Sequence, residues 1–276
     1  MKQQPLISVL VPAYNHEKFI RKTLDSILED DYSNKELIIL NDGSTDNTEQ
    51  EIEAWLKDNK GNIPVIYKYQ KNCGISKTRN SLIEKSNGAF LVFISSDDYL
   101  LQEGIRKRFN YLADNPEKLA VFSDCIVVDE NDHIISESGL SGYYSANKEN
   151  LKSDKKRKKE LVTNWSVPGG TLMIKRETYN KFQYDESLLI EDLDFYLKLV
   201  SQNKLGFIDE KVSAYRVHGA NTCMKDENWV KIQKDIINTY KKNLKRFSFS
   251  LQLRMLYKMA INYKPLLIYK LKKKVN

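Results

Sequence analysis

The sequence predicts an α/β fold with a mainly parallel, mixed β-sheet flanked by helices. Short runs of aromatic and β-branched residues, which are typical of buried strands, alternate with longer segments whose apolar residues recur at helical spacing. Strands that alternate with helices form parallel sheets with right-handed crossovers. The chain has 276 residues, 41% of them hydrophobic, which is enough for one large domain with an ample core.

The first half of the chain has the more regular pattern. Strands are predicted in four segments, 6–11, 36–40, 65–67 and 90–94. Helices are predicted in the three segments between them, 19–28, 46–56 and 76–83. Pro12 is expected to end the first strand, because proline cannot donate to a sheet. Asp46 and Glu49 have the spacing of a capping box for the second helix, and Ser76 is expected to cap the third.

The second half is less regular. Helices or strands are predicted at 102–113 (helix), 119–122 (strand), 171–174 (strand), 191–200 (helix) and 205–208 (strand), with a helical pattern from Trp229 onward. The segment 143–160 is polar and is expected to form a loop or to be partly disordered.

Two adjacent acids, Asp97 and Asp98, follow the predicted strand at 90–94. Burying unpaired carboxylates costs several kcal/mol or more, so this pair needs a cation. A divalent metal suits it, since such ions prefer oxygen ligands and often bring phosphates with them. The alternative from the residues alone is a polar strand end followed by a solvated turn.

Polar residues also follow two other predicted strands, at 12–15 and 41–44. In a parallel sheet the segments 12–15, 41–44 and 95–98 share one edge, and ligands gather beyond the carboxyl ends of the strands. Neither of the common glycine-rich phosphate loops occurs in the sequence. Phosphates bound here would therefore be held by a metal and by basic side chains.

The formal net charge is +7, and the excess is concentrated in two places. One is the segment 153–159, and the other is the C-terminal tail with Lys264, Lys270, Lys272, Lys273 and Lys274. Both fit a solvated loop and tail, and both fit attraction to anionic lipid head groups or anionic substrates. Aromatic residues do not interleave with these segments, so we expect no nucleic-acid partner.

The cysteines indicate a reducing compartment. Cys73, Cys125 and Cys223 are odd in number and far apart, which fits neither a disulfide framework nor a zinc site. The sequence also shows no apolar signal segment and no run of about 18 apolar residues that would suggest a spanning helix. We therefore expect a cytoplasmic protein.

Six short motifs follow one another along the chain. They are SVLVPAYN at 8–15, LNDGSTD at 40–46, NCGI with a later RN at 72–80, FISSDD at 93–98, EDLD at 191–194 and YRVH at 215–218. Together and in this order they resemble the family-2 glycosyltransferases, which have the GT-A fold, over roughly residues 6 to 223.

The resemblance implies a Rossmann-like GT-A catalytic domain at 1–223. Within it, 1–115 would be the nucleotide-binding half and 116–223 the acceptor-binding half, and 224–276 would be a basic helical extension. The implied reaction moves a sugar from a nucleoside diphosphate sugar, a UDP-sugar in our expectation, to an acceptor hydroxyl with inversion. We expect a saccharide or lipid-linked saccharide acceptor in bacterial surface polysaccharide or oligosaccharide synthesis, with peripheral contact at the inner face of an anionic membrane.

The resemblance also implies residue roles. Asp192 would be the general base, and Asp98 and His218 would hold Mn²⁺ or Mg²⁺ at the diphosphate. The nucleotide sugar would contact Pro12, Ala13, Tyr14, Asp42, Arg79, Ser96 and Asp97, with Asp42 facing the base and Arg216 as a further candidate for the diphosphate. The acceptor would contact Trp165, Gly170 and Glu191.

Two positions depart from the family pattern. Ser95 and Asn41 are neutral, where many relatives carry Asp. A second hypothesis is therefore a non-catalytic protein of the same fold that binds sugar nucleotides or other partners. A nucleotidyltransferase is a third, but it would need a glycine-rich basic loop after the first strand, where this chain has 12–16, PAYNH.

Overall fold

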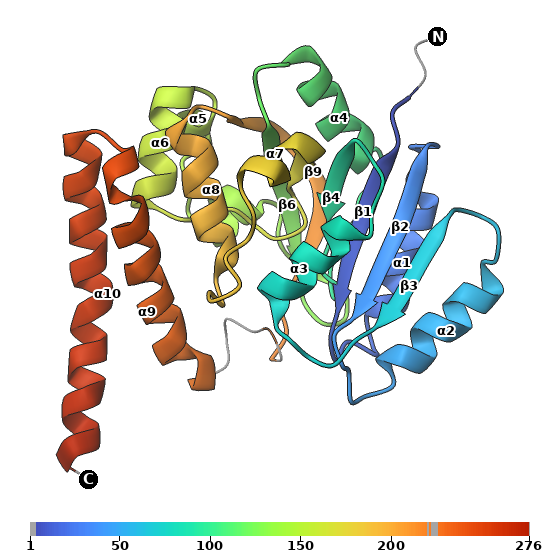
Figure 1. Ribbon diagram of the computed structural model, residues 1–276, viewed down its shortest axis with the longest axis horizontal. Coiled ribbons are helices and arrows are strands. Elements are labelled where there is room, and N and C mark those ends of the chain that lie inside the picture. The colour runs from blue at the N-terminus through green and yellow to red at the C-terminus, as the bar shows by residue number, and fades with distance from the viewer. Residues whose placement is uncertain (1–3, 220, 222–225, 276) are drawn as a thin grey trace.

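The computed structural model describes residues 4–219, 221 and 226–275, and this part of the chain is built around a nine-stranded sheet (Figure 1). The strands run in the order β3-β2-β1-β4-β8-β6-β9-β5, and β7 pairs with β6. Their bounds are β1 Ile7–Ala13, β2 Lys35–Asn41, β3 Val65–Tyr69, β4 Phe90–Phe93, β5 Tyr99–Leu100, β6 Ala120–Val128, β7 Ile134–Ser136, β8 Met173–Lys175 and β9 Leu205–Arg216.

The sheet is mixed but mostly parallel, which confirms the predicted fold class. Strands β3, β2, β1 and β4 pair in parallel, and so do β6 and β9. Strand β8 is antiparallel to both of its neighbours, β4 and β6. The carboxyl ends of β1, β2 and β4 therefore lie at one edge, as the sequence predicts.

Helices cover both faces of the sheet (Figure 1). Their bounds are α1 Ile20–Glu29, α2 Thr48–Asp58, α3 Ile75–Glu84, α4 Gly104–Asp114, α5 Lys148–Leu151, α6 Asp154–Thr163, α7 Arg176–Lys181, α8 Glu191–Ser201, α9 Asp226–Asn243 and α10 Phe249–Val275. Alternate strand residues enter two separate cores: Ile38 and Leu40 lie in one, and Leu37 and Ile39 in the other. This is the period-two pattern of a strand that is buried on both faces.

Several local expectations were wrong. Strand β1 continues through Pro12. The pairing of β1 with β4 ends at Leu10, so the missing N–H of Pro12 interrupts no hydrogen bond between these two strands. Helix α2 begins after Asn47 and has no capping box, although Asp46 still accepts the Thr48 N–H at 3.0 Å. Helix α3 begins after Gly74, and the Ser76 hydroxyl instead donates to the Leu188 carbonyl.

The segment 143–160 is largely helical, which corrects the predicted loop. Ser153 caps α6 by accepting from the Lys156 N–H, and Arg157 is buried. The Arg157 guanidinium donates to the Leu151 and Leu205 carbonyls, both at 2.6 Å. The basic composition of this segment suggested a solvated loop. Composition alone does not show that the charge of Arg157 is buried, where its guanidinium donates to backbone carbonyls.

The two C-terminal helices lie side by side at one end of the molecule (Figure 1). Helix α9 packs against α8, and α10 packs against both α9 and α6. No helix in the described part of the chain is long and apolar enough to cross a membrane.

Two of the three cysteines carry free thiols. Cys73 is exposed and Cys125 is buried, while Cys223 lies outside the described residues. The side chains of the tail lysines at 270 and 272–274 lie outside them as well.

Candidate functional site at the carboxyl edge of the sheet

The segments that follow β1 and β2 are bonded together at the sheet edge. The Asp42 N–H donates to the Ala13 carbonyl at 2.8 Å, and the Thr45 N–H donates to Asn15 Oδ1 at 2.7 Å. Asn15 has a φ of 54°, a left-handed conformation that asparagine tolerates better than most residues. Tyr14, between Ala13 and Asn15, is 42% exposed and so lies open at this edge.

Asp42 ties the edge to the segment before α3. Its Oδ1 accepts from the Cys73 N–H at 3.0 Å and from Gln70 Nε2 at 2.7 Å, and its Oδ2 accepts from the Gly74 N–H at 3.1 Å. The Asp42 side chain is buried. Its hydrogen bonds position the loop between β3 and α3. A contact with a nucleotide base, as expected from the sequence, would use the acceptor capacity left on the same two oxygens.

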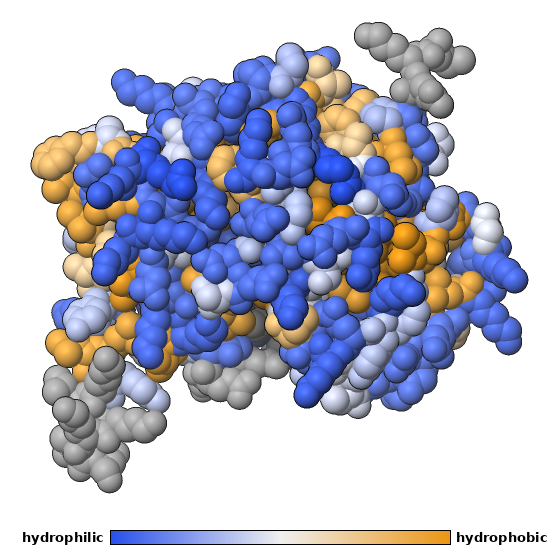
Figure 2. Space-filling view, in the orientation of Figure 1, coloured by the Kyte–Doolittle hydropathy of each residue, from blue (hydrophilic) through white to orange (hydrophobic). Residues whose placement is uncertain are grey.

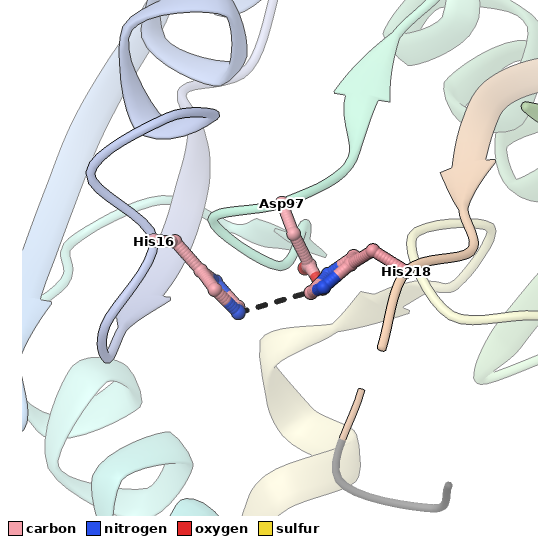
Figure 3. A group of neighbouring side chains, drawn as sticks. All are labelled: His16, Asp97 and His218. Atoms are coloured by element: carbon pink, nitrogen blue, oxygen red, sulfur yellow. Dashed lines mark hydrogen bonds and ion pairs between the residues drawn. The ribbon is translucent and has the colours of Figure 1, made fainter. Parts of the chain in front are cut away.

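Three side chains from distant parts of the chain converge at this edge (Figure 3). Asp97 Oδ2 lies 3.0 Å from His218 Nε2 and 3.6 Å from His16 Nε2. His16 Nδ1 lies 2.7 Å from Ser96 Oγ, and the His16 N–H donates to Thr48 Oγ1. His218 is buried and follows the end of β9. Ser96, which the sequence assigned to the nucleotide, thus orients one imidazole of the cluster.

The cluster suits a divalent cation. One ligand atom from each of His16, Asp97 and His218 lies within 4.8 Å of the other two. Two imidazole nitrogens and a carboxylate oxygen form a donor set that binds ions such as Mn²⁺. His16 was not anticipated from the sequence. The available signal was its place directly after the PAYN motif, at the strand edge where ligands gather.

Asp98 lies differently from Asp97. It is buried, and its Oδ1 accepts the Arg216 N–H at 2.9 Å. On its other side it faces the turn at Gly169, where a Cβ would lie 3.6 Å from Asp98 Oδ2. Asp98 is therefore tied to the end of β9 and does not belong to the cluster of His16, Asp97 and His218.

The surroundings of Asp97 and Asp98 also shift the pKa values of these two acids in opposite directions. Burial and the charge of Asp97 raise the pKa of Asp98 well above its usual range. Burial alone would raise the pKa of Asp97 as well, but the hydrogen bond from His218 and the charge of His16 lower it. Of the two acids, Asp97 is the one whose carboxylate faces both imidazoles.

Arg216 braces this edge from within. Its side chain is buried, its Nε donates to the Asp97 carbonyl, and its Nη2 pairs with Asp132 at 2.7 Å. The guanidinium also lies over the Phe19 ring, 4.7 Å from the centroid. The Arg216 guanidinium is therefore already paired with groups of this chain. The geometry favours a structural role for Arg216 over the contact with a diphosphate that the sequence suggested.

The acidic start of α8 lies beside α3. Arg79 Nη1 of α3 pairs with Glu191 Oε1 at 2.7 Å, and both side chains are largely buried. Burial raises the pKa of Glu191 to about 7 and also raises the pKa of Asp192. The Asp192 Oδ1 accepts only the N–H of Leu193 among the described hydrogen bonds, at 2.8 Å. Arg79 thus faces the acidic motif rather than standing alone in solvent.

Two neighbouring segments hold this motif in place. Ser76 and Asn80 of α3 bond the carbonyls of Leu188 and Tyr184. On the other side, Asp235 of α9 accepts the Leu189 N–H at 2.7 Å. The C-terminal helices therefore contribute to the position of the acids that begin α8.

Two of the expected acceptor residues, Trp165 and Gly170, lie in the segment between α6 and β8. Trp165 is partly buried and packs edge-on against Tyr196, with 4.9 Å between ring centroids. Gly170 has a φ of 71°, a left-handed conformation that favours glycine, and a Cβ there would lie 2.7 Å from Ile94 Cδ1, which would have to shift. Both residues have structural contacts that account for their types, and their contact with an acceptor stays a prediction.

The fold and the edge cluster define an α/β protein of the GT-A type with a candidate cation site. The chain matches the family model described as glycosyl transferase family 2 over residues 8–182, which is more than half of its length. The protein belongs to this family. The match ends before the acidic start of α8 and before His218.

Known proteins similar to this chain agree with that family. The glycosyltransferase GlyA of Streptococcus pneumoniae is 27% identical over 236 residues, which cover 81% of this chain and 32% of that protein. The chain thus spans about a third of that relative's length. Among solved structures, Staphylococcus aureus TarS 1–349 in complex with UDP-GlcNAc has a TM-score of 0.70 at 19% identity, covering 93% of this chain and 72% of that one. The mannosyltransferase PcManGT of Pyrobaculum calidifontis, in complex with GDP-Man and Mn²⁺, has a TM-score of 0.69 at 15% identity, covering 97% and 75%.

Proposed function

We propose that this protein is a metal-dependent, inverting glycosyltransferase. It transfers a sugar from a nucleoside diphosphate sugar, of the UDP-sugar class, to an acceptor hydroxyl. The observation that carries the proposal is the cluster of His16, Asp97 and His218 at the carboxyl edge of a family-2 sheet. The similar structures support the donor class and the cation, because they hold UDP-GlcNAc in one case and GDP-Man with Mn²⁺ in the other.

The proposed cation site comprises His16, Asp97 and His218. A bound Mn²⁺ or Mg²⁺ would supply positive charge beside the diphosphate, where negative charge grows as the anomeric C–O bond breaks. The chain's own residues prepare that place: Ser96 orients His16, and both imidazoles lie beside the Asp97 carboxylate. Two bonds from Arg216 hold the pair in position, one from its backbone N–H to the Asp98 carboxylate and one from its Nε to the Asp97 carbonyl.

Asp192 is the proposed general base. It would accept the proton of the attacking hydroxyl, which forms the new bond on the opposite face of the sugar and inverts the anomeric centre. A raised pKa suits this role, because a stronger base accepts the hydroxyl proton more readily. Glu191 and its partner Arg79 would hold Asp192 and a substrate hydroxyl in position.

The nucleotide would lie along the edge formed by Pro12, Ala13, Tyr14 and Asp42. The exposed Tyr14 ring offers an aromatic face to a base, and Asp42 offers acceptor oxygens. For the acceptor we propose a saccharide or lipid-linked saccharide used in surface polysaccharide synthesis, bound near Trp165. The protein would then work at the cytoplasmic face of a membrane.

Hydrolysis of donors tests the proposed function. A panel of UDP-, GDP- and dTDP-sugars is incubated with the wild type, with Asp192→Asn and with the exposed control Asp114→Asn. We expect turnover of UDP-sugars by the wild type and the control, and its loss in Asp192→Asn. Binding of UDP without turnover of any donor would instead favour the non-catalytic alternative that the neutral Ser95 and Asn41 suggest.

A further inference from the structure

The solvent-facing side of α10 is apolar. Its exposed apolar residues are between 45% and 74% exposed, and they are Phe249, Leu253, Leu256, Tyr257, Ile261, Tyr263, Leu267, Ile268 and Tyr269. The opposite side of the helix is buried through Leu251, Met255 and Leu266. Figure 2 shows hydrophobic residues gathered along the edge of the molecule that α10 forms.

The spacing places four of these residues in one stripe. Phe249, Leu253 and Leu256 are four and three residues apart, and Leu267 follows eleven residues later, so all four lie on one line along the helix. A surface helix normally places its polar residues outward and its apolar residues inward. Helix α10 has apolar residues on both sides, so its outer stripe lacks the covering that its inner side has.

The charge around the stripe has a single sign. Helix α10 carries Arg254, Lys258, Lys264 and four lysines after residue 269, and no aspartate or glutamate follows Asp235 in the sequence. A helix with an exposed apolar stripe flanked by lysine and arginine is typical of a helix that lies in the interface of an anionic bilayer. Its tyrosines add aromatic rings with a polar tip, which favour the same interface.

A hollow adjoins the stripe. It has a volume of about 250 Å³ and lies between α9 and α10, and it is lined by Lys234, Ile237 and Asn238 of α9 and by Tyr263, Leu266 and Leu267 of α10. Leu267 belongs to both the stripe and the hollow, so the apolar surface continues from the outer face of α10 toward α9.

From these observations we infer that the outer face of α10 docks on the surface of an anionic lipid bilayer. The apolar stripe enters the head-group region while Arg254, Lys258 and Lys264 meet the lipid phosphates. A second copy of the chain is a poorer occupant, because two such helices would bring only positive charges together. The segment 153–159 contributes less than its composition suggests, since Arg157 is turned inward.

The inference deepens the proposed function, on which its biological meaning rests. Helix α10 runs toward the same side of the molecule as the carboxyl ends of β1 and β2 (Figure 1). A bilayer along the outer face of α10 would lie at the end of the molecule that the C-terminal helices form, away from β1 and β2 (Figure 1). A protein that docks on a bilayer through α10 would suit an acceptor saccharide that is held on a lipid.

Flotation with vesicles tests the inference. The vesicles are an equal mixture of phosphatidylcholine and phosphatidylglycerol, and vesicles of phosphatidylcholine alone serve for comparison. The stripe variant is Leu253→Gln/Leu256→Gln, because glutamine keeps helix propensity. The matched control is Ile134→Gln/Ile135→Gln on β7, where the two side chains are 53% and 52% exposed.

We expect the wild type and the control to bind the anionic vesicles at low salt. The affinity of the stripe variant for these vesicles should be at least about tenfold lower. Arg254→Gln/Lys264→Gln should also bind more weakly and lose part of the salt dependence. Unchanged binding by the stripe variant would overturn the inference. So would a wild-type dimer that the stripe substitutions dissociate without any vesicle binding, since the stripe would then pair with a second copy.

Hydrolysis of a UDP-sugar without vesicles separates this inference from the proposed function. The stripe variant should hydrolyse the donor at the wild-type rate, because the substituted residues lie outside the candidate site. If the wild type hydrolyses no donor and vesicle binding still depends on the stripe, the proposed function fails and the docking surface stands.

Discussion

His218 Nε2 lies 3.0 Å from Asp97 Oδ2, although 121 residues separate the two along the chain. The sheet order explains this contact. Asp97 follows β4, and His218 follows β9. Strand β5 begins directly after Asp98 and pairs antiparallel with β9, which brings the two segments together. His16, after β1, completes the cluster from the neighbouring strand. The fold thus brings together three groups that could hold one cation.

The histidines should therefore determine the affinity for a divalent ion. Replacing His218 by alanine removes one of the donor atoms, and we expect Mn²⁺ binding in the presence of UDP to weaken about 10-fold to 100-fold. Titration calorimetry measures this directly. His133→Ala is the matched control, because the His133 side chain is 78% exposed and lies outside the cluster. Equal Mn²⁺ affinity in the two variants would remove His218 from the site.

Replacing Asp192 by asparagine should abolish most of the transfer. The amide keeps the shape and the acceptor oxygen for the Leu193 N–H, but it cannot take up the proton of the acceptor hydroxyl. We expect kcat to fall about 10²-fold or more with little change in the affinity for UDP. Initial rates and UDP titration measure the two quantities. A variant that transfers sugar at the wild-type rate would show that another group is the base.

The stability of the protein should depend on the protonation of Glu191. Burial raises the pKa of this carboxyl to about 7, above its ordinary value of 4.5, so the folded chain keeps a proton that the unfolded chain loses. The free energy of unfolding therefore gains from Glu191 at acidic pH and loses this contribution as the pH rises from about 4.5 to about 7. In Glu191→Gln this part of the pH dependence should disappear. Urea unfolding across that range tests it, and an unchanged slope in the variant would contradict the raised pKa.

Asp42 should matter for the stability of the edge as well as for the nucleotide. Alanine at this position leaves the N–H groups of Cys73 and Gly74 without their acceptor, at a cost of about 1–3 kcal/mol. Asparagine keeps one acceptor oxygen and should cost less. Urea unfolding gives the two costs, and UDP titration gives the effect on binding. If the alanine variant and the wild type unfold at the same urea concentration, the loop does not depend on Asp42.

Much of the fold followed from the sequence, because β1, β2 and β4 contain apolar runs whose residues alternate between two cores. The short strands β5 and β7 were not predicted, since two or three residues carry no detectable period. Helix α6 was missed for a different reason. Its stability depends on Arg157 reaching the carbonyls of Leu151 and Leu205, and Leu205 is far away in the sequence.

The site was predicted at the level of motifs and less well at the level of atoms. The motifs predicted that the segments after β1, β2 and β4 meet at one edge, as they do, and Asp97 and His218 are both in the cluster there. The sequence analysis assigned the metal to Asp98 and the nucleotide sugar to Asp97, but a sequence does not show the direction that the turn gives these two adjacent side chains. It also did not include His16, whose place in the cluster depends on the bond between its imidazole and Ser96.

The division of the chain into a domain at 1–223 and an extension at 224–276 stays a prediction. The contact between Asp235 and the Leu189 N–H bears on it, since it couples α9 to the start of α8. We expect Asp235→Ala to lower the transfer rate as well as the stability, because the loop that leads to Glu191 and Asp192 loses a bond. Rates that stay at the wild-type level under conditions where the variant is folded would show that the extension does not position the acids.

The comparison of Asp97→Asn with Asp98→Asn tests the central claim most directly. Both substitutions keep the size of the side chain, and asparagine at position 98 can still accept the Arg216 N–H. The measurement is the Mn²⁺ dependence of UDP-sugar turnover in each variant. The account predicts that Asp97→Asn requires at least about tenfold more Mn²⁺ for half-maximal turnover, while Asp98→Asn stays close to the wild type. The reverse order, or turnover that is independent of metal in the wild type, would contradict it.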